Sequence, residues 1–213
     1  MKTLKILLAA GLLAGLGGLG FLYSGLYPMG ADVPHNALTY WALETLRERS
    51  IARAIRDIEV PPLDDPQMLL AGGADYNDMC SGCHLKPGKT GSDISQGLYP
   101  QPPNLAMSAE AHHHAEGGDG GGHGDMKTSA ARQFWIIKHG IKASGMAAFG
   151  PTHEDERIWA MVAFLQKLPT LNAVQYQILT ARMPGESGHD EHGASAETPA
   201  TGADDGQAEA HAH

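Results

Sequence analysis

The two cysteines of this chain lie three residues apart and are followed directly by a histidine, in the run Cys80-Ser81-Gly82-Cys83-His84. Two thiols on one helical turn can each form a thioether with a vinyl group of one haem, and the next residue then lies beneath the iron as an axial ligand. The run therefore predicts one covalently bound haem c, attached through Cys80 and Cys83 and ligated by His84.

Three other uses of this cysteine pair fit the sequence less well. A thioredoxin-like redox pair belongs in a βαβ unit, but the preceding residues 69–76 have a helical pattern. A structural zinc site usually needs a second pair of cysteines or histidines at matching distance, and no second cysteine pair exists. A disulfide across two intervening residues would close a very small, strained loop.

The flanking segments supply elements that could hold a haem. Gly72, Tyr76 and Cys80 recur at helical spacing before the motif, and residues 154–168 form a second amphipathic helix that ends before Pro169. Its apolar stripe consists of Ile158, Trp159, Met161, Val162, Phe164, Leu165 and Leu168. Between the two helices lie a proline-rich loop, Pro102-Pro103-Asn104-Leu105, and a glycine-flanked loop at residues 140–149.

This arrangement resembles the class I c-type cytochromes over roughly residues 66–170. The resemblance implies a mainly α haem domain and assigns roles one residue at a time. Met146 would be the second axial ligand of the iron, and the carbonyl of Pro103 would accept the remaining ring N–H of His84. Tyr76, Trp159 and Phe164 would pack around the haem pocket, and Gly72 would let the first helix cross closely against the last.

The assignment of Met146 has competitors. The family often has proline directly after the ligand methionine, whereas Ala147 follows here. Met107 and Met126 also lie downstream of the cysteines, and methionine is commonly a core residue. Met146 is preferred because a glycine-flanked loop lets a side chain approach the iron. With both axial positions filled, we expect an electron carrier rather than an enzyme.

The N-terminus predicts export from the cytoplasm. Lys2 and Lys5 precede a run without charged residues from Ile6 to Tyr27. As a helix, this run would be about 33 Å long, enough for a hydrocarbon core of about 30 Å. The preceding lysines place the N-terminus inside and the haem domain in the periplasm. A cleaved signal peptide is the alternative, although Tyr23, Tyr27 and Pro28 favour an uncleaved single-pass anchor in the cytoplasmic membrane.

A further helix is predicted between the anchor and the haem domain, from Asn36 to Glu59. Its apolar positions are Leu38, Trp41, Ala42, Thr45, Ile51, Ala54, Ile55 and Ile58, with four arginines on the rest, at 47, 49, 53 and 56. Such a helix could lie in the membrane interface with its arginines near lipid phosphates. It could equally be a solvated strut or pack against the haem domain. Both interpretations stay open.

Two segments lack the pattern of a packed core. Residues 109–125 are rich in glycine and include His112, His113, His114 and His123. Residues 184–213 contain seven acidic residues and no lysine or arginine, so this tail supplies −7 of the net charge of −9. We expect a mobile insert and a disordered acidic tail. The histidines could weakly bind copper, zinc or nickel, or the segments could be simple spacers.

The sequence thus predicts a mainly α protein in four parts. These are an anchor (1–28), an amphipathic connector and linker (29–65), a cytochrome c domain with an insert (66–183) and a tail (184–213). The expected function is one-electron transfer between respiratory redox partners on the outer face of the cytoplasmic membrane, without nucleic acid. One alternative is a dedicated cytochrome c subunit of a membrane dehydrogenase or terminal oxidase complex. Another is a haem protein that handles copper or zinc.

Overall fold

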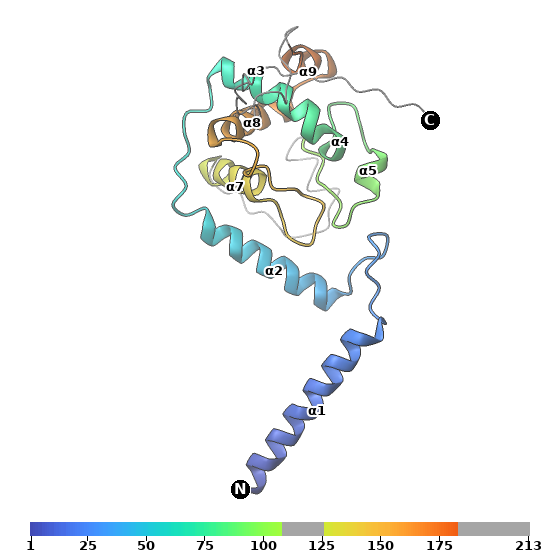
Figure 1. The fold of residues 1–213 in the computed structure, drawn as a ribbon. Coiled ribbons are helices and arrows are strands. Elements are labelled where there is room, and N and C mark those ends of the chain that lie inside the picture. The colour runs from blue at the N-terminus through green and yellow to red at the C-terminus, as the bar shows by residue number, and fades with distance from the viewer. Residues whose placement is uncertain (108–125, 183–213) are drawn as a thin grey trace, which may run out of the picture. The chain divides into compact units, whose positions relative to one another are not determined.

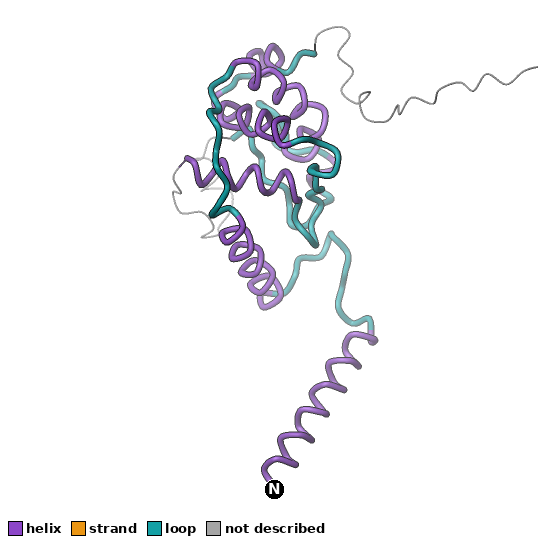
Figure 2. Tube along the Cα trace, turned by 60° about the vertical axis from the view of Figure 1, so that its left-hand side comes forward, coloured by secondary structure: helices purple, strands orange, loops and turns teal. Residues whose placement is uncertain are grey.

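A computed structural model of the chain describes residues 1–107 and 126–182. The whole predicted insert at 109–125 and the whole predicted tail at 184–213 lie outside the described residues. Within the described residues every regular element is a helix, as Figure 2 shows. The prediction of a mainly α fold is therefore confirmed.

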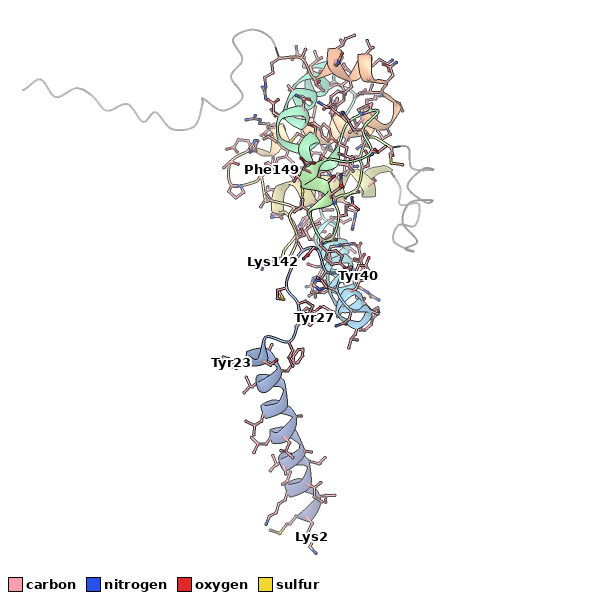
Figure 3. All side chains as sticks on the ribbon, turned by 90° about the vertical axis from the view of Figure 1, so that its right-hand side faces the viewer. Lys2, Tyr23, Tyr27, Tyr40, Lys142 and Phe149 are labelled. Carbon is pink, nitrogen blue, oxygen red and sulfur yellow. The ribbon has the colours of Figure 1, made fainter. Side chains whose placement is uncertain are left out.

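The N-terminal helix α1 spans Lys2–Ser24 and ends at Gly25, whose φ of 67° is readily adopted only by glycine. Figure 3 shows Lys2 and Tyr23 at opposite ends of α1. The helix has a mean hydropathy of 2.0 and is the one helix of the described chain that is long and apolar enough to cross a membrane. This agrees with either an anchor or a signal sequence.

The connector helix α2 spans Ala37–Ala54 and begins at Asn36, whose side chain accepts a hydrogen bond from the N–H of Thr39. The helix was predicted to continue to Glu59, but it ends five residues earlier. The chain then leaves the helix, and Ile58, Val60 and Leu63 pack against the buried core of the domain. The linker is thus part of the packed structure, because three of its apolar side chains gain burial there.

The motif region follows as a series of short helices, shown in Figure 1. Helix α3 spans Pro66–Asp75 and begins with Asp65 as N-cap and Pro66 in its first turn, a strong start signal. It continues without a break into a π-helical turn, η1 (Tyr76–Cys80), and then into α4 (Ser81–His84). Helix α5 (Asp93–Gln96) begins with a reciprocal capping box between Ser92 and Ser95.

Four more elements of the described chain complete the domain. Helix α7 spans Met126–His139, and α8 spans Asp155–Lys167. A 3-10 turn, η2 (Leu168–Thr170), leads to a short helix α9 (Ala173–Leu179) that the sequence analysis did not predict. Its start carries a capping box between Asn172 and Gln175, which is the signal that identifies it.

The core forms where α3 crosses α8. A Cβ atom added at Gly72 would overlap the backbone of Ala160 and lie 2.7 Å from the backbone nitrogen of Met161. The close crossing predicted for Gly72 is therefore present. Around it lies one cluster of buried side chains: Tyr76, Ala130, Phe134, Ile137, Ile158, Met161, Val162, Phe164, Leu165, Leu168 and Tyr176.

Candidate functional site

The cysteine motif forms a compact turn at the end of the α3–η1–α4 series. Cys80 ends η1 and Cys83 lies one turn later in α4; both are free thiols and both are partly exposed. The hydroxyl of Ser81, between them, donates to the carbonyl of Asn77 at 2.7 Å. Burial is the main cause that raises the pKa of Cys80 to about 12, and the negative charges of Asp75 and Cys83 add to the increase. The turn thus presents two thiols side by side, as thioether attachment requires.

Tyr76 fixes the exit from this turn. Its hydroxyl lies 2.7 Å from the carbonyl oxygen of Leu85 and 3.2 Å from that of His84, and it donates toward both. Leu85 itself has a φ of 66°, an unusual conformation for a residue with a branched side chain. Burial raises the pKa of Tyr76 far above its ordinary value, so the hydroxyl keeps its proton and remains a donor. The predicted pocket residue Tyr76 therefore also supports the backbone that carries His84.

His84 is oriented by the proline-rich loop. Its ring nitrogen Nδ1 lies 3.0 Å from the carbonyl oxygen of Pro103. A carbonyl can only accept, so Nδ1 must carry the proton and Nε2 the lone pair. Burial lowers the pKa of His84, while the bond to Pro103 raises it in part. A neutral imidazole with its lone pair on Nε2 is the form that binds iron.

The Pro103 loop is tied to the motif at several points. The N–H of Leu105 donates to the carbonyl of His84 at 3.1 Å, so the loop contacts both the ring and the backbone of that residue. Asn104 donates from its side-chain amide to the carbonyl of Lys89 and accepts the N–H of Ala106. The loop's place beside His84 therefore depends on backbone bonds as well as on the ring contact.

Met146 lies in a loop that closes on the end of α7. The N–H of Ile141 donates to the carbonyl of Met146, and the N–H of Met146 donates to the hydroxyl of Ser144, both at 3.1 Å. Gly140, with a φ of 64°, makes the sharp exit from α7, and a Cβ there would lie 2.7 Å from the carbonyl oxygen of Met146. The Met146 side chain is partly buried and packs against the core.

The other two methionines lie in different settings. Met107 directly follows the Pro103 loop and is partly buried. Met126 begins α7, but its side chain is outside the described part of the structure. Met146 is the methionine held by a closed loop, and its role as iron ligand stays a prediction.

The predicted aromatic residues fall into two groups. Tyr76 and Phe164 meet with ring centroids 5.4 Å apart, and Tyr176 of α9 packs edge-on against both. Trp159 belongs to the other group, stacked on Phe134 of α7 with centroids 4.1 Å apart. The first group supports the helix crossing and the motif turn, and the second joins α8 to α7.

Two contributions to the site were missed by the sequence analysis. The hydroxyl of Tyr176, in α9, donates to the side-chain oxygen of Asn77 at 3.1 Å and so supports the cysteine turn. Asp75, nearly fully buried, receives two hydrogen bonds from Arg157, at 2.6 and 2.8 Å. Asp75 ends α3 after seven residues without charge, 68–74, and a carboxylate placed on such a buried segment is a sequence signal for a pair, because a buried carboxylate needs a cation.

The residues present fit a haem. Two thiols, an imidazole with its lone pair oriented and a thioether form a suitable donor set. Cys80, Leu105, Met146 and Trp159 each pack on the buried core and stay partly exposed, so each offers apolar surface for contact with a haem.

A search of the described residues for other metal sites finds no group of three or more histidine, cysteine or acidic side chains placed to hold an ion. The four insert histidines, His112, His113, His114 and His123, lie outside the described residues. Metal binding by them stays a prediction.

Helices and motif together define a small α-helical c-type cytochrome domain. The family model described as "Cytochrome C oxidase, cbb3-type, subunit III" matches residues 67–165, so this part of the chain is a class I cytochrome c domain of that family. Searches of the curated proteins and of the solved structures each found no match. A cytochrome c domain implies haem-based electron transfer and redox partners, and the Cys80/Cys83 pair suggests covalent haem c.

Proposed function

We propose that this protein holds one haem c through thioethers to Cys80 and Cys83, with His84 and Met146 as axial ligands. It would relay single electrons between respiratory partners on the outer face of the cytoplasmic membrane. The observation that carries the proposal is the 3.0 Å contact between His84 Nδ1 and the Pro103 carbonyl, at the end of the cysteine turn. That contact leaves Nε2 as the ring nitrogen for iron.

The bound haem would supply a one-electron iron couple, and the chain would supply orientation and exclusion of water. The Pro103 carbonyl fixes the plane and tautomer of the His84 ring. The Tyr76 hydroxyl holds the backbone through the carbonyl oxygens of His84 and Leu85. The closed Met146 loop offers a soft, neutral sulfur ligand, which favours ferrous iron and raises the reduction potential. With both axial positions occupied, no position is open to substrate, which supports a carrier rather than an enzyme.

The proposed location rests on α1. A 23-residue apolar helix with lysines before its uncharged run supports an uncleaved anchor whose following residues lie outside the cytoplasm. We accordingly propose the division into anchor (1–28), connector and linker (29–65), cytochrome c domain (66–183) and tail (184–213). Covalent haem attachment to a C-x-x-C-H run outside the cytoplasm is consistent with either an anchor or a signal sequence.

A second candidate function is favoured by the family match. The matching family is named for a subunit of a terminal oxidase, which supports a dedicated electron-transfer subunit of an oxidase or dehydrogenase complex. The two functions differ in how long the partner stays bound. A carrier should be purified alone from native membranes in mild detergent, whereas a subunit should co-purify with its enzyme at fixed stoichiometry.

The third candidate, copper or zinc handling by the insert and tail, has no support within the described residues. Tight stoichiometric copper binding by the purified protein would support this candidate function. Replacing residues 109–125 with a short Gly-Ser link should then abolish the binding while haem incorporation stays unchanged.

Ligation is the most direct test of the main proposal. The ferric protein should show the weak absorption band at the red end of the visible spectrum that reports a methionine–iron bond. Met146→Ala should abolish this band, lower the reduction potential and open the site to small ligands such as cyanide. Met107→Ala and Met126→Ala are matched controls that should retain the band. Loss of the band in a control, with retention in Met146→Ala, would reassign the ligand.

Attachment is tested separately. Haem should remain with the denatured chain after acid extraction in the wild-type protein, and Cys80→Ser together with Cys83→Ser should release it. A haem that is extracted from the wild-type chain would contradict the proposal at its first step.

A further inference from the structure

Helix α2 exposes large apolar side chains, although part of the helix is packed. Leu38, Trp41 and Leu46 have exposed fractions of 72%, 64% and 68%. Ile51, near the other end of the same helix, is 1% exposed. The sequence pattern placed Leu38, Trp41 and Ile51 on one side of the helix, whereas in the structure Ile51 is packed and Leu38 and Trp41 are exposed, as is Leu46.

The exposed residues share one side of the helix. Leu38, Trp41, Ala42 and Leu46 recur at i, i+3, i+4 and i+8, and all four are exposed. We call these four residues the α2 apolar stripe. At about 100° per residue, the buried Ile51 lies about 140° round the helix from Leu38, whereas Glu48, which pairs with Arg132 of α7, lies beside Trp41. Leu38, Ala42 and Leu46 therefore point away from the element on which α2 is docked, and Trp41 lies at the edge of the stripe nearer to it.

Charge follows the stripe along the helix. Arg49 and Arg53 continue the same side for the next two turns, and both are exposed. The acidic residues of α2 are engaged elsewhere, because Glu44 pairs with Arg47, and Glu48 pairs with Arg47 and Arg132. The exposed side of α2 thus begins apolar and ends cationic, a combination typical of helices that lie at a phospholipid surface.

The stripe also follows closely on a helix that can cross a membrane. Only residues 25–36 separate α1 from α2, and the hydroxyl of Tyr27 lies 2.9 Å from His35 Nδ1, so this connection is folded back on itself. Tyr23 and Tyr27 at its start are residues that favour the level of lipid headgroups. A short, folded connection keeps the first turns of α2 near the point where α1 would leave the bilayer.

We propose that the α2 apolar stripe lies in the headgroup region of the membrane, with Arg49 and Arg53 beside lipid phosphates. The inference deepens the proposed membrane location and rests on it. Since α2 is bound to α7 through Glu48 and Arg132, lipid contact along the stripe would fix the orientation of the cytochrome domain above the bilayer. The partner is a lipid surface with anionic headgroups.

The test uses the full haem-loaded chain in nanodiscs of phosphatidylethanolamine and phosphatidylglycerol. The photoreactive residue benzoylphenylalanine replaces Trp41 on the stripe, and in a matched variant it replaces Tyr40, which lies outside the stripe, about 160° round the helix from Leu38, and is itself an aromatic, half-exposed residue. A third variant places it at Leu13 within α1. We expect lipid adducts at position 41 at least fivefold above those at position 40, with an unchanged haem spectrum.

The Leu13 variant separates this inference from the proposed anchor. Adducts at 13 with equal, low yields at 40 and 41 would overturn the stripe while leaving the anchor in place. Adducts at 41 without any at 13 would support the stripe and overturn the anchor. For the arginines, Arg49→Gln with Arg53→Gln, or discs without phosphatidylglycerol, should reduce the yield at 41 about twofold or more. An undiminished yield in both would overturn the phosphate contact.

Discussion

Two pairs of helices in this protein are each joined by a helix contact and an arginine–carboxylate ion pair, but the two junctions differ in strength. Helices α3 and α8 share the crossing at Gly72, and Arg157 pairs with Asp75, whose side chain is 6% exposed. Helices α2 and α7 also contact each other, Ile51 of α2 is buried, and Arg132 of α7 pairs with Glu48, whose side chain is 39% exposed. The first pair joins backbones, and the second joins mainly side chains.

This difference separates a rigid region from a detachable one. The α3–α8 crossing carries the cysteine turn at one end, so any change in its spacing moves Cys80 and His84. The α2–α7 contact carries no predicted ligand. It could open without disturbing the core, since the energy it supplies comes from one buried side chain and a partly exposed ion pair.

The largest effect is expected at Gly72. In Gly72→Ala the added methyl group overlaps the backbone of Ala160, so the helices must separate along the whole crossing. We expect a loss of about 3 kcal/mol in the free energy of unfolding and a reduced yield of haem-loaded protein. Gly97→Ala is the control, because the nearest atom to its new Cβ would be 3.5 Å away. Denaturant unfolding of both variants measures the difference, and equal stabilities would disprove the close crossing.

The next effect concerns the buried ion pair. Arg157→Met keeps much of the aliphatic side chain but leaves the Asp75 carboxylate buried without its cation. We expect a loss of about 2 kcal/mol, below the range for fully buried pairs because Arg157 is partly exposed. Lys138→Met removes the cation from the exposed pair with Asp155 and should cost much less. If both variants lose the same amount, the α3–α8 pair is no stronger than a surface pair.

A smaller and local effect is expected from Ile51→Ala in α2. The change leaves a cavity at the one buried residue of α2, at a cost of about 1–2 kcal/mol that is limited by undocking of the helix. Amide hydrogen exchange should quicken in α2 while the amides of α3 and α8 keep their protection. Leu46→Ala, at an exposed position, should leave exchange in solution unchanged. Faster exchange throughout the domain would show that the connector is integral to the core.

The smallest effect depends on pH. Burial would raise the pKa of Glu48, but hydrogen bonds and charge from Arg132 and Arg47 outweigh it and hold the pKa below the ordinary value of 4.5. A lowered folded-state pKa stabilises the protein above about pH 4.5, and this stabilisation is lost as the pH falls through the folded value. Wild type should therefore exceed Glu48→Gln in stability by less than about 1 kcal/mol at pH 7. The gap should close as the pH falls from 4.5 through the lowered folded-state pKa of Glu48, and a gap that stays constant would remove the ion pair as its cause.

The sequence predicted the parts of the fold that depend on local signals. The helical spacing of Gly72, Tyr76 and Cys80 predicts the helix that leads into the cysteine motif, and the apolar spacing of residues 154–168 predicts α8. Glycine at position 72 predicts the crossing, because a side chain there would prevent close approach. These features depend on residue type and spacing, which a sequence displays directly.

Other features depend on the tertiary structure. The end of α2 at Ala54 is decided by the burial of Ile58, Val60 and Leu63 on a core formed by later residues. The pairing of Asp75 with Arg157 joins residues 82 positions apart, and no local rule selects that arginine. Likewise, the capping box of α9 predicts a helix but not that Tyr176 would pack beneath Tyr76.

The crossing of α3 with α8 also sets the order in which the protein can fold. Many buried core residues, including Ile158, Met161, Val162, Phe164 and Leu165, come from α8, near the end of the domain. A growing chain that stops before Glu154 has the cysteine motif but lacks the helix on which α3 packs. Contacts between residues so far apart form slowly, because a long loop must close first. The motif would therefore stay on an open chain, with both thiols accessible, until the core assembles around them.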